Sequence, residues 1–386
     1  MRWIAFIVVA GLVAIGVGTF VALPGIVERE LNPVTDPPPY TVSAPAASLH
    51  ATLDVADMHA DSLLWGRDLL RRGVRGHVDV PRLIEGHYAL QVFSLPTKTP
   101  RGLNYDTNDD KSDNIFWLAV VQRWPPRTWY SLTERALYQA ERLHAAAAAS
   151  GGRFTVIHSA NELRAYRERR RTNPTITAGL LSIEGAHALD GNLANLDRLY
   201  EAGYRMMSPS HFFDNDIGGS SAGVNKIGLT DKGRELVRRM EARHMIVDLA
   251  HASAKTIDDV LALATKPVVV SHTGVKATCD NNRNLTSDQV RRIAASGGLI
   301  GIGFWDTASC GHDARAIANT IRVTVGLVGV EHVALGSDFD GAVEAPFDAS
   351  GVARVTEALL AGGMTAADIR LVMGGNVLRF LESELP

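Results

Sequence analysis

From about residue 50 to the C-terminus, short apolar runs alternate with longer segments whose apolar residues repeat at helical spacing. Strands that alternate with helices form βαβ units, in which the strands are parallel. Eight such runs in one chain predict a closed (β/α)8 TIM barrel, an α/β fold, with an open doubly wound sheet as the alternative. The eight runs end in DVADMHAD, YALQVFSLP, AGLLSIEGAH, YRMMSPSH, MIVDLAH, PVVVSH, GLIGIGFWD and HVALGSDFDG.

The segments between these runs carry signals for the start and the end of helices. Thr230 and Ser253 each precede an amphipathic stretch, as helix N-caps do, and Gly203 and Gly297 each follow one. We therefore expect helices over residues 132–148, 192–203, 230–244, 253–264, 286–298 and 314–329.

Polar side chains capable of chemistry stand mainly at the C-terminal ends of the apolar runs. In a barrel these ends meet at one face, where active sites lie. An open sheet would instead gather such groups at a single switch point, so their spread over many runs favours the barrel. The residues are His59, Asp61, Glu184, His211, His251, His272 and Asp338.

The N-terminal segment is a separate, strongly apolar region. One basic residue, Arg2, precedes an apolar run from Trp3 to Val27 that is long enough to cross a bilayer, which needs about 20 residues. We interpret residues 1–28 as a signal-anchor, with a cleavable signal peptide as the alternative. Either form predicts an exported protein of the cell envelope, with its domain in the periplasm or outside the cell.

Two further segments differ from the βα pattern. Residues 29–49 are rich in Pro, Ala and Ser, which predicts an extended tether, so the folded domain is expected over 50–386. Residues 97–131 are too long for an ordinary βα connection. We expect them to cover the barrel mouth, with Trp124 or Trp129 packed into it, or else to form a solvated surface excursion.

Composition and missing motifs narrow the chemistry. A formal net charge of −3 gives no reason to expect nucleic acid binding, and two cysteines cannot form a cysteine metal cluster. No nucleophile elbow, Walker or Rossmann glycine pattern occurs between a predicted strand and helix. Five histidine and carboxylate groups at the strand ends are too many for one tetrahedral ion, but they suit two ions that share a carboxylate.

Several motifs stand in a fixed order along nearly the whole predicted domain. They are DMHAD, SIEGAH, SPSHFFDNDIGGSS, GLTDKGRELV with IVDLAHAS, VVVSHTGVKATCDNNRN and GSDFDG. In this order they resemble the renal (membrane) dipeptidase family, metallopeptidase family M19 of the amidohydrolase-like barrels. The resemblance implies an enzyme that binds two Zn²⁺ ions and hydrolyses the peptide bond of a dipeptide with water activated between the ions.

The resemblance also implies a role for each matching ligand residue. His59 and Asp61 would bind one zinc ion, and His251 and His272 would bind the other. Glu184 would bridge the two ions.

The resemblance also implies that three further residues contact the substrate. His211 would polarise the scissile carbonyl, Arg283 would hold the free carboxylate of the substrate, and Asp338 would contact the substrate and transfer the proton. It further implies a disulfide between Cys279 and Cys310, which would stiffen the loop that carries Arg283. From their positions beside the ligands, we expect three aspartates to orient ligand histidines: Asp57, Asp248 and Asp340.

The sequence leaves two other functions open. One is a related amidohydrolase that acts on lactams, cyclic amides or N-acyl amino acids. The other is an envelope protein that uses the same scaffold for binding without catalysis. For partners, we expect a dipeptide substrate, the membrane through the N-terminal segment, and a homodimer as one state open to the chain.

Overall fold

The computed structural model describes residues 22–386. The predicted signal-anchor or signal peptide therefore lies mostly outside the described residues. Among the residues that are described, no helix is both long and apolar enough to cross a bilayer.

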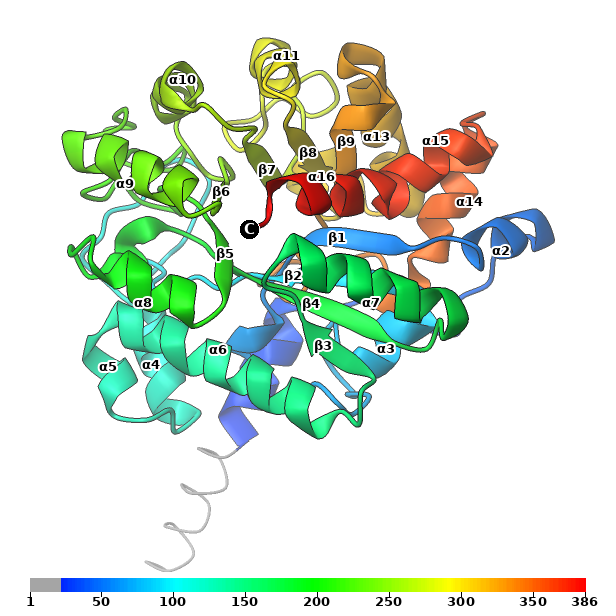
Figure 1. Cartoon of the computed structure of the whole chain (residues 1–386), viewed down its shortest axis with the longest axis horizontal. Helices are drawn as coiled ribbons and strands as arrows, with labels where there is room; N and C mark the ends of the chain where they lie inside the picture. Colours follow the sequence, from blue (N-terminus) through cyan, green and yellow to red (C-terminus); the bar gives the residue numbers. More distant parts are fainter. Residues whose placement is uncertain (1–21) are drawn as a thin grey trace, which may run out of the picture.

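A parallel sheet forms the centre of the molecule (Figure 1). Eight strands follow one another in the order β6-β5-β4-β2-β1-β9-β8-β7, and a parallel bridge between Asp248 and Val269 joins the two ends of this path. These are the eight predicted strands, so the barrel expectation is confirmed. The strands are β1 (Val55–Ala60), β2 (Tyr88–Phe93), β4 (Thr177–Ile183), β5 (Tyr204–Met207), β6 (Ile246–Val247), β7 (Val269–Thr273), β8 (Leu299–Ile302) and β9 (Val333–Leu335).

A ninth strand, β3 (Phe154–Val156), pairs with β4 outside the ring. Its three residues are too few to produce a recognisable apolar alternation, so the sequence does not predict this strand.

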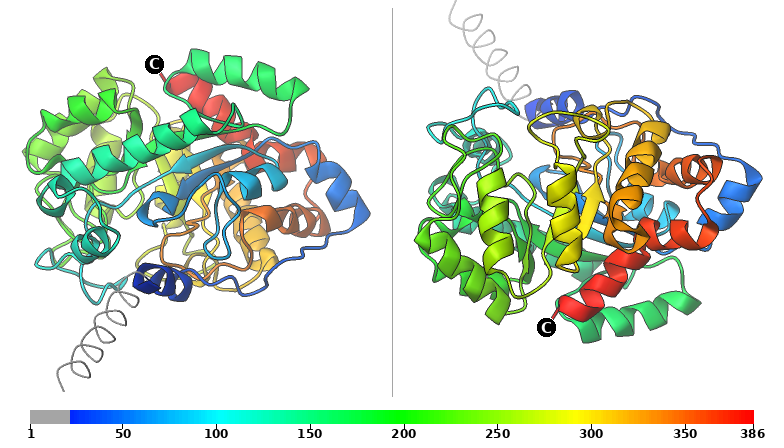
Figure 2. Two further views of the ribbon diagram at one scale, coloured as in Figure 1. Left: turned by 90° about the horizontal axis from the view of Figure 1, so that it is seen from below. Right: turned by 90° about the horizontal axis from the view of Figure 1, so that it is seen from above.

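Helices surround the strands in all three views (Figures 1 and 2). The predicted start signals are confirmed: Thr230 accepts a hydrogen bond from Gly233 N, and Ser253 accepts one from Thr256 N. The helices are α2 (Ala44–His50), α3 (Val80–Glu85), α4 (Asn114–Val121), α5 (Arg127–Tyr130), α6 (Leu132–Ala149), α7 (Ala160–Thr172), α8 (Asn195–Glu201), α9 (Asp231–Ala242), α10 (Ala254–Leu263), α11 (Ser287–Ala295), α12 (Asp306–Ser309), α13 (Ala314–Val328), α14 (Ala353–Ala361), α15 (Ala366–Arg370) and α16 (Asn376–Glu384).

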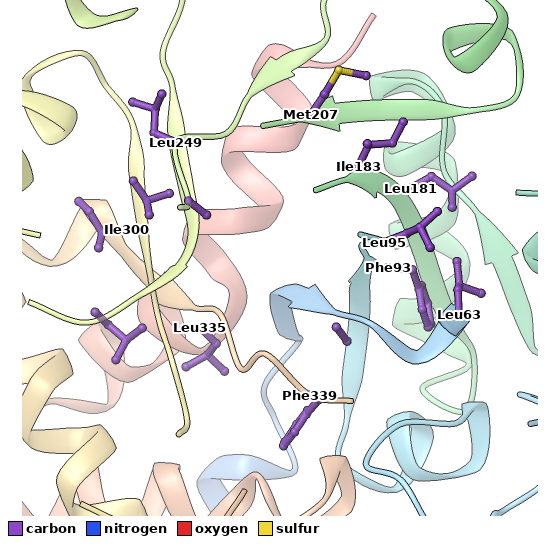
Figure 3. Close-up of a cluster of buried hydrophobic side chains, with 14 of the residues drawn as sticks. Leu63, Phe93, Leu95, Leu181, Ile183, Met207, Leu249, Ile300, Leu335 and Phe339 are labelled. Atoms are coloured by element: carbon purple, nitrogen blue, oxygen red, sulfur yellow. The ribbon is translucent and has the colours of Figure 1, made fainter. Parts of the chain in front are cut away.

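The barrel strands are buried along their whole length, because a parallel sheet of this kind is covered on both faces. Figure 3 shows part of the core, in which Phe93, Ile183 and Met207 lie on one side and Ile300 and Leu335 on the other. Apolar side chains fill this core, so the polar groups at the strand ends collect at the barrel mouth.

The N-terminal segment differs from the expected tether. Residues 22–31 are helical, and the next residue, Asn32, is buried. Val34 forms a parallel bridge with Ala345, and the backbone N–H of Ser43 donates to Glu357 of α14 at 2.8 Å. This part of the chain therefore packs along the domain through specific hydrogen bonds, which its Pro-rich composition does not reveal.

Candidate functional site

The five predicted metal ligands converge at the barrel mouth. His59 and Asp61 come from β1 and the residue after it, Glu184 follows β4, His251 follows β6, and His272 lies in β7. All five are at most 5% exposed. Because the carboxyl ends of the strands meet at one face, residues that are up to 213 positions apart become neighbours.

Glu184 is the centre of this cluster. Its Oε1 atom lies 2.9 Å from Nε2 of His251, 3.3 Å from Nε2 of His272 and 3.8 Å from Nε2 of His59. Gly185 follows with a φ of +93°, a conformation that favours glycine, and a Cβ atom there would lie 2.3 Å from the ring of His187. This glycine therefore lets the chain turn tightly beside Glu184.

Burial and nearby charges shift the pKa values of Glu184 and the three ligand histidines. Burial raises the pKa of Glu184 well above its usual range, because the charged carboxylate loses its hydration. Burial opposes a charge on His59 as well, but Glu184 and Asp61 outweigh it and raise the pKa of His59 to about 10. The pKa values of His251 and His272 are lowered by burial, which leaves these imidazoles neutral, the form that binds metal.

Unpaired buried atoms indicate that the cluster binds a cation. Among the described residues, His59 Nε2, Asp61 Oδ1 and Glu184 Oε1 are buried without a hydrogen-bond partner. Burying such atoms destabilises the folded state unless another group or an ion binds them. Nitrogen and carboxylate oxygen ligands suit Zn²⁺ and similar ions, so the residues present fit divalent cations. Three overlapping groups have all their ligand atoms within 4.8 Å of one another: His59, Glu184 and His272; Glu184, His211 and His251; His59, Asp61 and Asp338.

The three predicted substrate residues border the same cluster. His211 Nε2 lies 3.2 Å from Glu184 Oε2, and Asp338 Oδ1 lies 3.6 Å from His59 Nε2. Burial raises the pKa of Asp338 to about 7. Burial also lowers the pKa of His211 well below its usual range, which leaves its ring neutral.

Arg283 is held at the edge of the cluster by its loop. Its Nη2 group donates to the carbonyl oxygen of His272 at 2.8 Å, and its guanidinium lies 5.5 Å from the ring centre of Trp305. The expected disulfide between Cys279 and Cys310 is present and fixes this loop against the segment after β8. Among the described residues, Nε of Arg283 has no partner, so it remains available to a ligand.

A cavity of about 410 Å³ lies over these groups. Asp61, Glu184, His211, Arg283 and Asp338 are among its lining residues. This volume is in the range of small-molecule sites, and its polar groups are few and grouped together.

The 97–131 segment reaches this cavity, but not through the expected residues. Leu103, Tyr105, Ile115 and Leu118 line the cavity walls. Trp124 instead packs against Tyr138 of α6, and its backbone oxygen accepts a hydrogen bond from the indole N–H of Trp129 at 3.1 Å. The tryptophans therefore attach the segment to the helical layer, while smaller side chains cover the site.

Tyr105 is a site residue that sequence reasoning missed. It lines the cavity together with Arg283 and Asp338, and its ring lies 5.8 Å from that of Phe212. Its isolation as one aromatic residue within the polar stretch NYDTNDD was the only available signal.

The expectation that three aspartates orient ligand histidines is wrong. Asp57 accepts from Ser337, and Asp248 accepts from the backbone N–H groups of Ala250 and Ser271. The partner of a ligand histidine is instead the hydroxyl of Ser271, which lies 2.9 Å from Nδ1 of His272.

Asp340, the third of these aspartates, contacts no ligand histidine. It binds Ser62, Arg67 and the backbone of His77. The serine, the arginine and the backbone N–H group together satisfy the oxygens of Asp340, so this carboxylate does not orient a ligand histidine.

Comparisons with known proteins agree with this geometry. The membrane dipeptidase family (peptidase family M19) matches residues 43–385. A "Dipeptidase aclJ" of Aspergillus oryzae is 27% identical over 88% of this chain and 80% of its own length. An uncharacterized protein in the pqqA 5′ region of Klebsiella pneumoniae is 32% identical over 61% of this chain and 90% of its own length.

Solved structures agree as well. The dipeptidase AC, described as a metallopeptidase of family M19, has a TM-score of 0.69 at 25% identity and covers 86% of this chain and 99% of its own. A metallopeptidase from Rhodobacter sphaeroides, liganded with a phosphinate mimic of the dipeptide L-Ala-D-Ala, has a TM-score of 0.67 at 25% identity and the same coverage. The chain therefore belongs to the membrane dipeptidase family, peptidase family M19.

Proposed function

We propose that the protein is a zinc dipeptidase that binds two ions per chain and hydrolyses the single peptide bond of a dipeptide. One observation carries this proposal: a single carboxylate oxygen of Glu184 lies within 3.8 Å of imidazole nitrogens from three different strand ends. His59 and Asp61 would hold one ion and His251 and His272 the other, with Glu184 shared between them. When bound, the ions would activate water and polarise the carbonyl of the substrate.

The residues around the ligands would position the substrate and move the proton. A neutral His211 can donate a hydrogen bond to the carbonyl oxygen as negative charge develops on it. Asp338, with a pKa of about 7, is able both to accept a proton from the attacking water and to deliver it to the leaving amine.

Arg283 would determine the length of the substrate. Its planar guanidinium can bind a carboxylate through two parallel hydrogen bonds. A carboxylate held there would leave space for only one residue between it and the bond that is cleaved, so a peptide with a second residue after that bond would not fit.

Substrate length and the free carboxylate provide the test. We expect zinc in the purified protein and hydrolysis of dipeptides, with little or no hydrolysis of tripeptides, dipeptide amides, N-acyl amino acids or lactams. Arg283→Ala should lower the rate on free dipeptides selectively, and Arg283→Lys, which keeps the charge, is the matched control. Preferential turnover of lactams or N-acyl amino acids would instead indicate a related amidohydrolase, and zinc content without any turnover would indicate a binding protein.

We also propose that the domain works outside the cytoplasm, tethered by its apolar N-terminal segment. The disulfide between Cys279 and Cys310 supports an oxidising compartment, because such bonds form and persist there. Fractionation of cells that express the full chain tests this: the protein should sediment with membranes, and a protease added from outside should reach it. Recovery in the cytosol would contradict the tether.

A further inference from the structure

The helix at residues 22–31 forms part of the wall of the catalytic cavity. Val27 and Leu31 line the cavity together with Leu64, which follows β1, and Val343, which follows β9. Figure 2 shows this helix, in dark blue, packed beside the barrel mouth. Val27 and Leu31 are four residues apart, so they lie on the same side of the helix.

A buried charge fixes the helix in this place. Glu28, only 1% exposed, forms ion pairs with Arg67 and Arg75, and Arg67 in turn pairs with Asp340. Immediately after the helix, the side chain of Asn32 accepts a hydrogen bond from the backbone N–H of Ala342 at 2.9 Å. The helix is thus attached to the same β9 loop that carries Asp338.

The wall is apolar, and it belongs to a different part of the barrel from Arg283. Arg283 lies in the loop after β7, whereas Leu64 and Val343 follow β1 and β9, and β8 separates β7 from β9 in the ring. If Arg283 holds the C-terminal carboxylate, the other residue of a dipeptide extends away from it, toward these apolar side chains. Leu31 is still 43% exposed, so it has surface left for a ligand to cover.

We propose that Val27 and Leu31 are specificity determinants that contact the side chain of the substrate's N-terminal residue and favour a large apolar side chain there. This inference rests on the proposed dipeptidase function. Its consequence is that the end of the predicted membrane anchor and the residues just after it contribute directly to substrate choice.

The test uses the full chain, the double variant Val27→Ser/Leu31→Ser, and Ile26→Ser as the matched control. Ile26 is an apolar residue of the same helix, is 54% exposed, and does not line the cavity. We expect the double variant to lose about tenfold in kcat/KM for Leu-Ala, as loss of an apolar pocket contact does, with Gly-Ala and Ala-Leu changed less than about twofold. Ile26→Ser should behave as the wild type on all three.

A binding measurement separates this inference from the proposed function. Phosphinate mimics of Leu-Ala and Gly-Ala, titrated calorimetrically, should show the same selective loss of affinity in the double variant. Equal losses on Gly-Ala and Leu-Ala, a loss confined to Ala-Leu, or an unchanged preference would overturn the inference while the dipeptidase function stands. A wild-type protein that neither hydrolyses dipeptides nor binds their mimics would overturn both.

Discussion

Two clusters of charged side chains share the short segment after β9, and their buried carboxylates are satisfied by different partners. We call them the histidine cluster and the arginine cluster, and Asp338 belongs to the first while Asp340, two residues later, belongs to the second. The histidine cluster consists of Asp61, Glu184, Asp338, His59, His211, His251 and His272. The arginine cluster consists of Glu28, Asp340, Arg67 and Arg75.

The arginine cluster is satisfied by the chain itself. The two oxygens of Asp340 accept hydrogen bonds from Ser62, Arg67 and the backbone N–H groups of His77 and Val78. Burial opposes the charge of Asp340, but Arg67 and His77 outweigh it and hold the pKa of this carboxyl below its usual range.

The histidine cluster lacks such partners. Among the described residues, Asp61 Oδ1 and Glu184 Oε1 have no donor, and the pKa of Asp338 is raised to about 7 by burial. A buried carboxylate requires a cation or hydrogen-bond donors. In the arginine cluster, arginines of the chain therefore balance the buried carboxylates. In the histidine cluster, external cations must do so.

The largest effect is expected from Glu184→Gln. The neutral amide cannot bridge two cations, so metal content should fall. Loss of a residue that only hydrogen-bonds to a metal ligand costs up to roughly 100-fold in activity, and we expect a larger loss here. Metal analysis and dipeptide hydrolysis measure both quantities. Full metal content with an unchanged rate would show that the histidine cluster does not need the Glu184 carboxylate to bind cations.

Asp338→Asn should cost slightly less, because it removes the proton carrier and leaves the five proposed ligands in place. General acid–base groups contribute roughly 10²–10⁴-fold, and we expect a loss of that size in kcat. Metal content and the free energy of unfolding should stay close to the wild-type values. A variant that loses its metal would place Asp338 among the ligands instead.

Asp340→Asn should lower the stability of the protein and leave its metal content unchanged. It leaves Arg67 with Glu28 as its remaining carboxylate, and breaking a buried pair in this way costs at most about 3–5 kcal/mol of stability. Urea unfolding measures this loss, while metal content should be retained. An unchanged stability combined with lost metal would contradict the assignment of Asp340 to the arginine cluster.

The sequence predicted the histidine cluster well because each member ends an apolar run. A strand in a parallel barrel is apolar throughout, so a polar residue at its end marks the mouth of the barrel, as His59 and His272 do. The eight predicted strands identified the fold for the same reason. Known motif order then located Arg283, which no local pattern distinguishes from a solvated arginine.

The arginine cluster could not be predicted, because it is built from long-range pairs. Glu28 and Arg67 are 39 residues apart, and Arg67 and Asp340 are 273 apart. Nothing local indicates that a residue at the end of an apolar N-terminal run will be buried against the β9 loop. The same reasoning explains the unexpected packing of residues 29–49, whose composition alone is typical of a tether.

The smallest expected effect is a change with pH in the free energy of unfolding, which tests the arginine cluster. The pKa of Asp340 is lower in the folded protein than in the unfolded chain, so its contribution to stability is fully present above the ordinary aspartate range and is lost as pH falls through the folded value. Unfolding curves between pH 6 and pH 3 should therefore converge for the wild type and Asp340→Asn, by on the order of 1 kcal/mol per unit of pKa difference. Arg67 stays charged in this range, so its own titration does not explain a convergence. A constant difference between the two curves would mean that Arg67 does not stabilise the charge on Asp340.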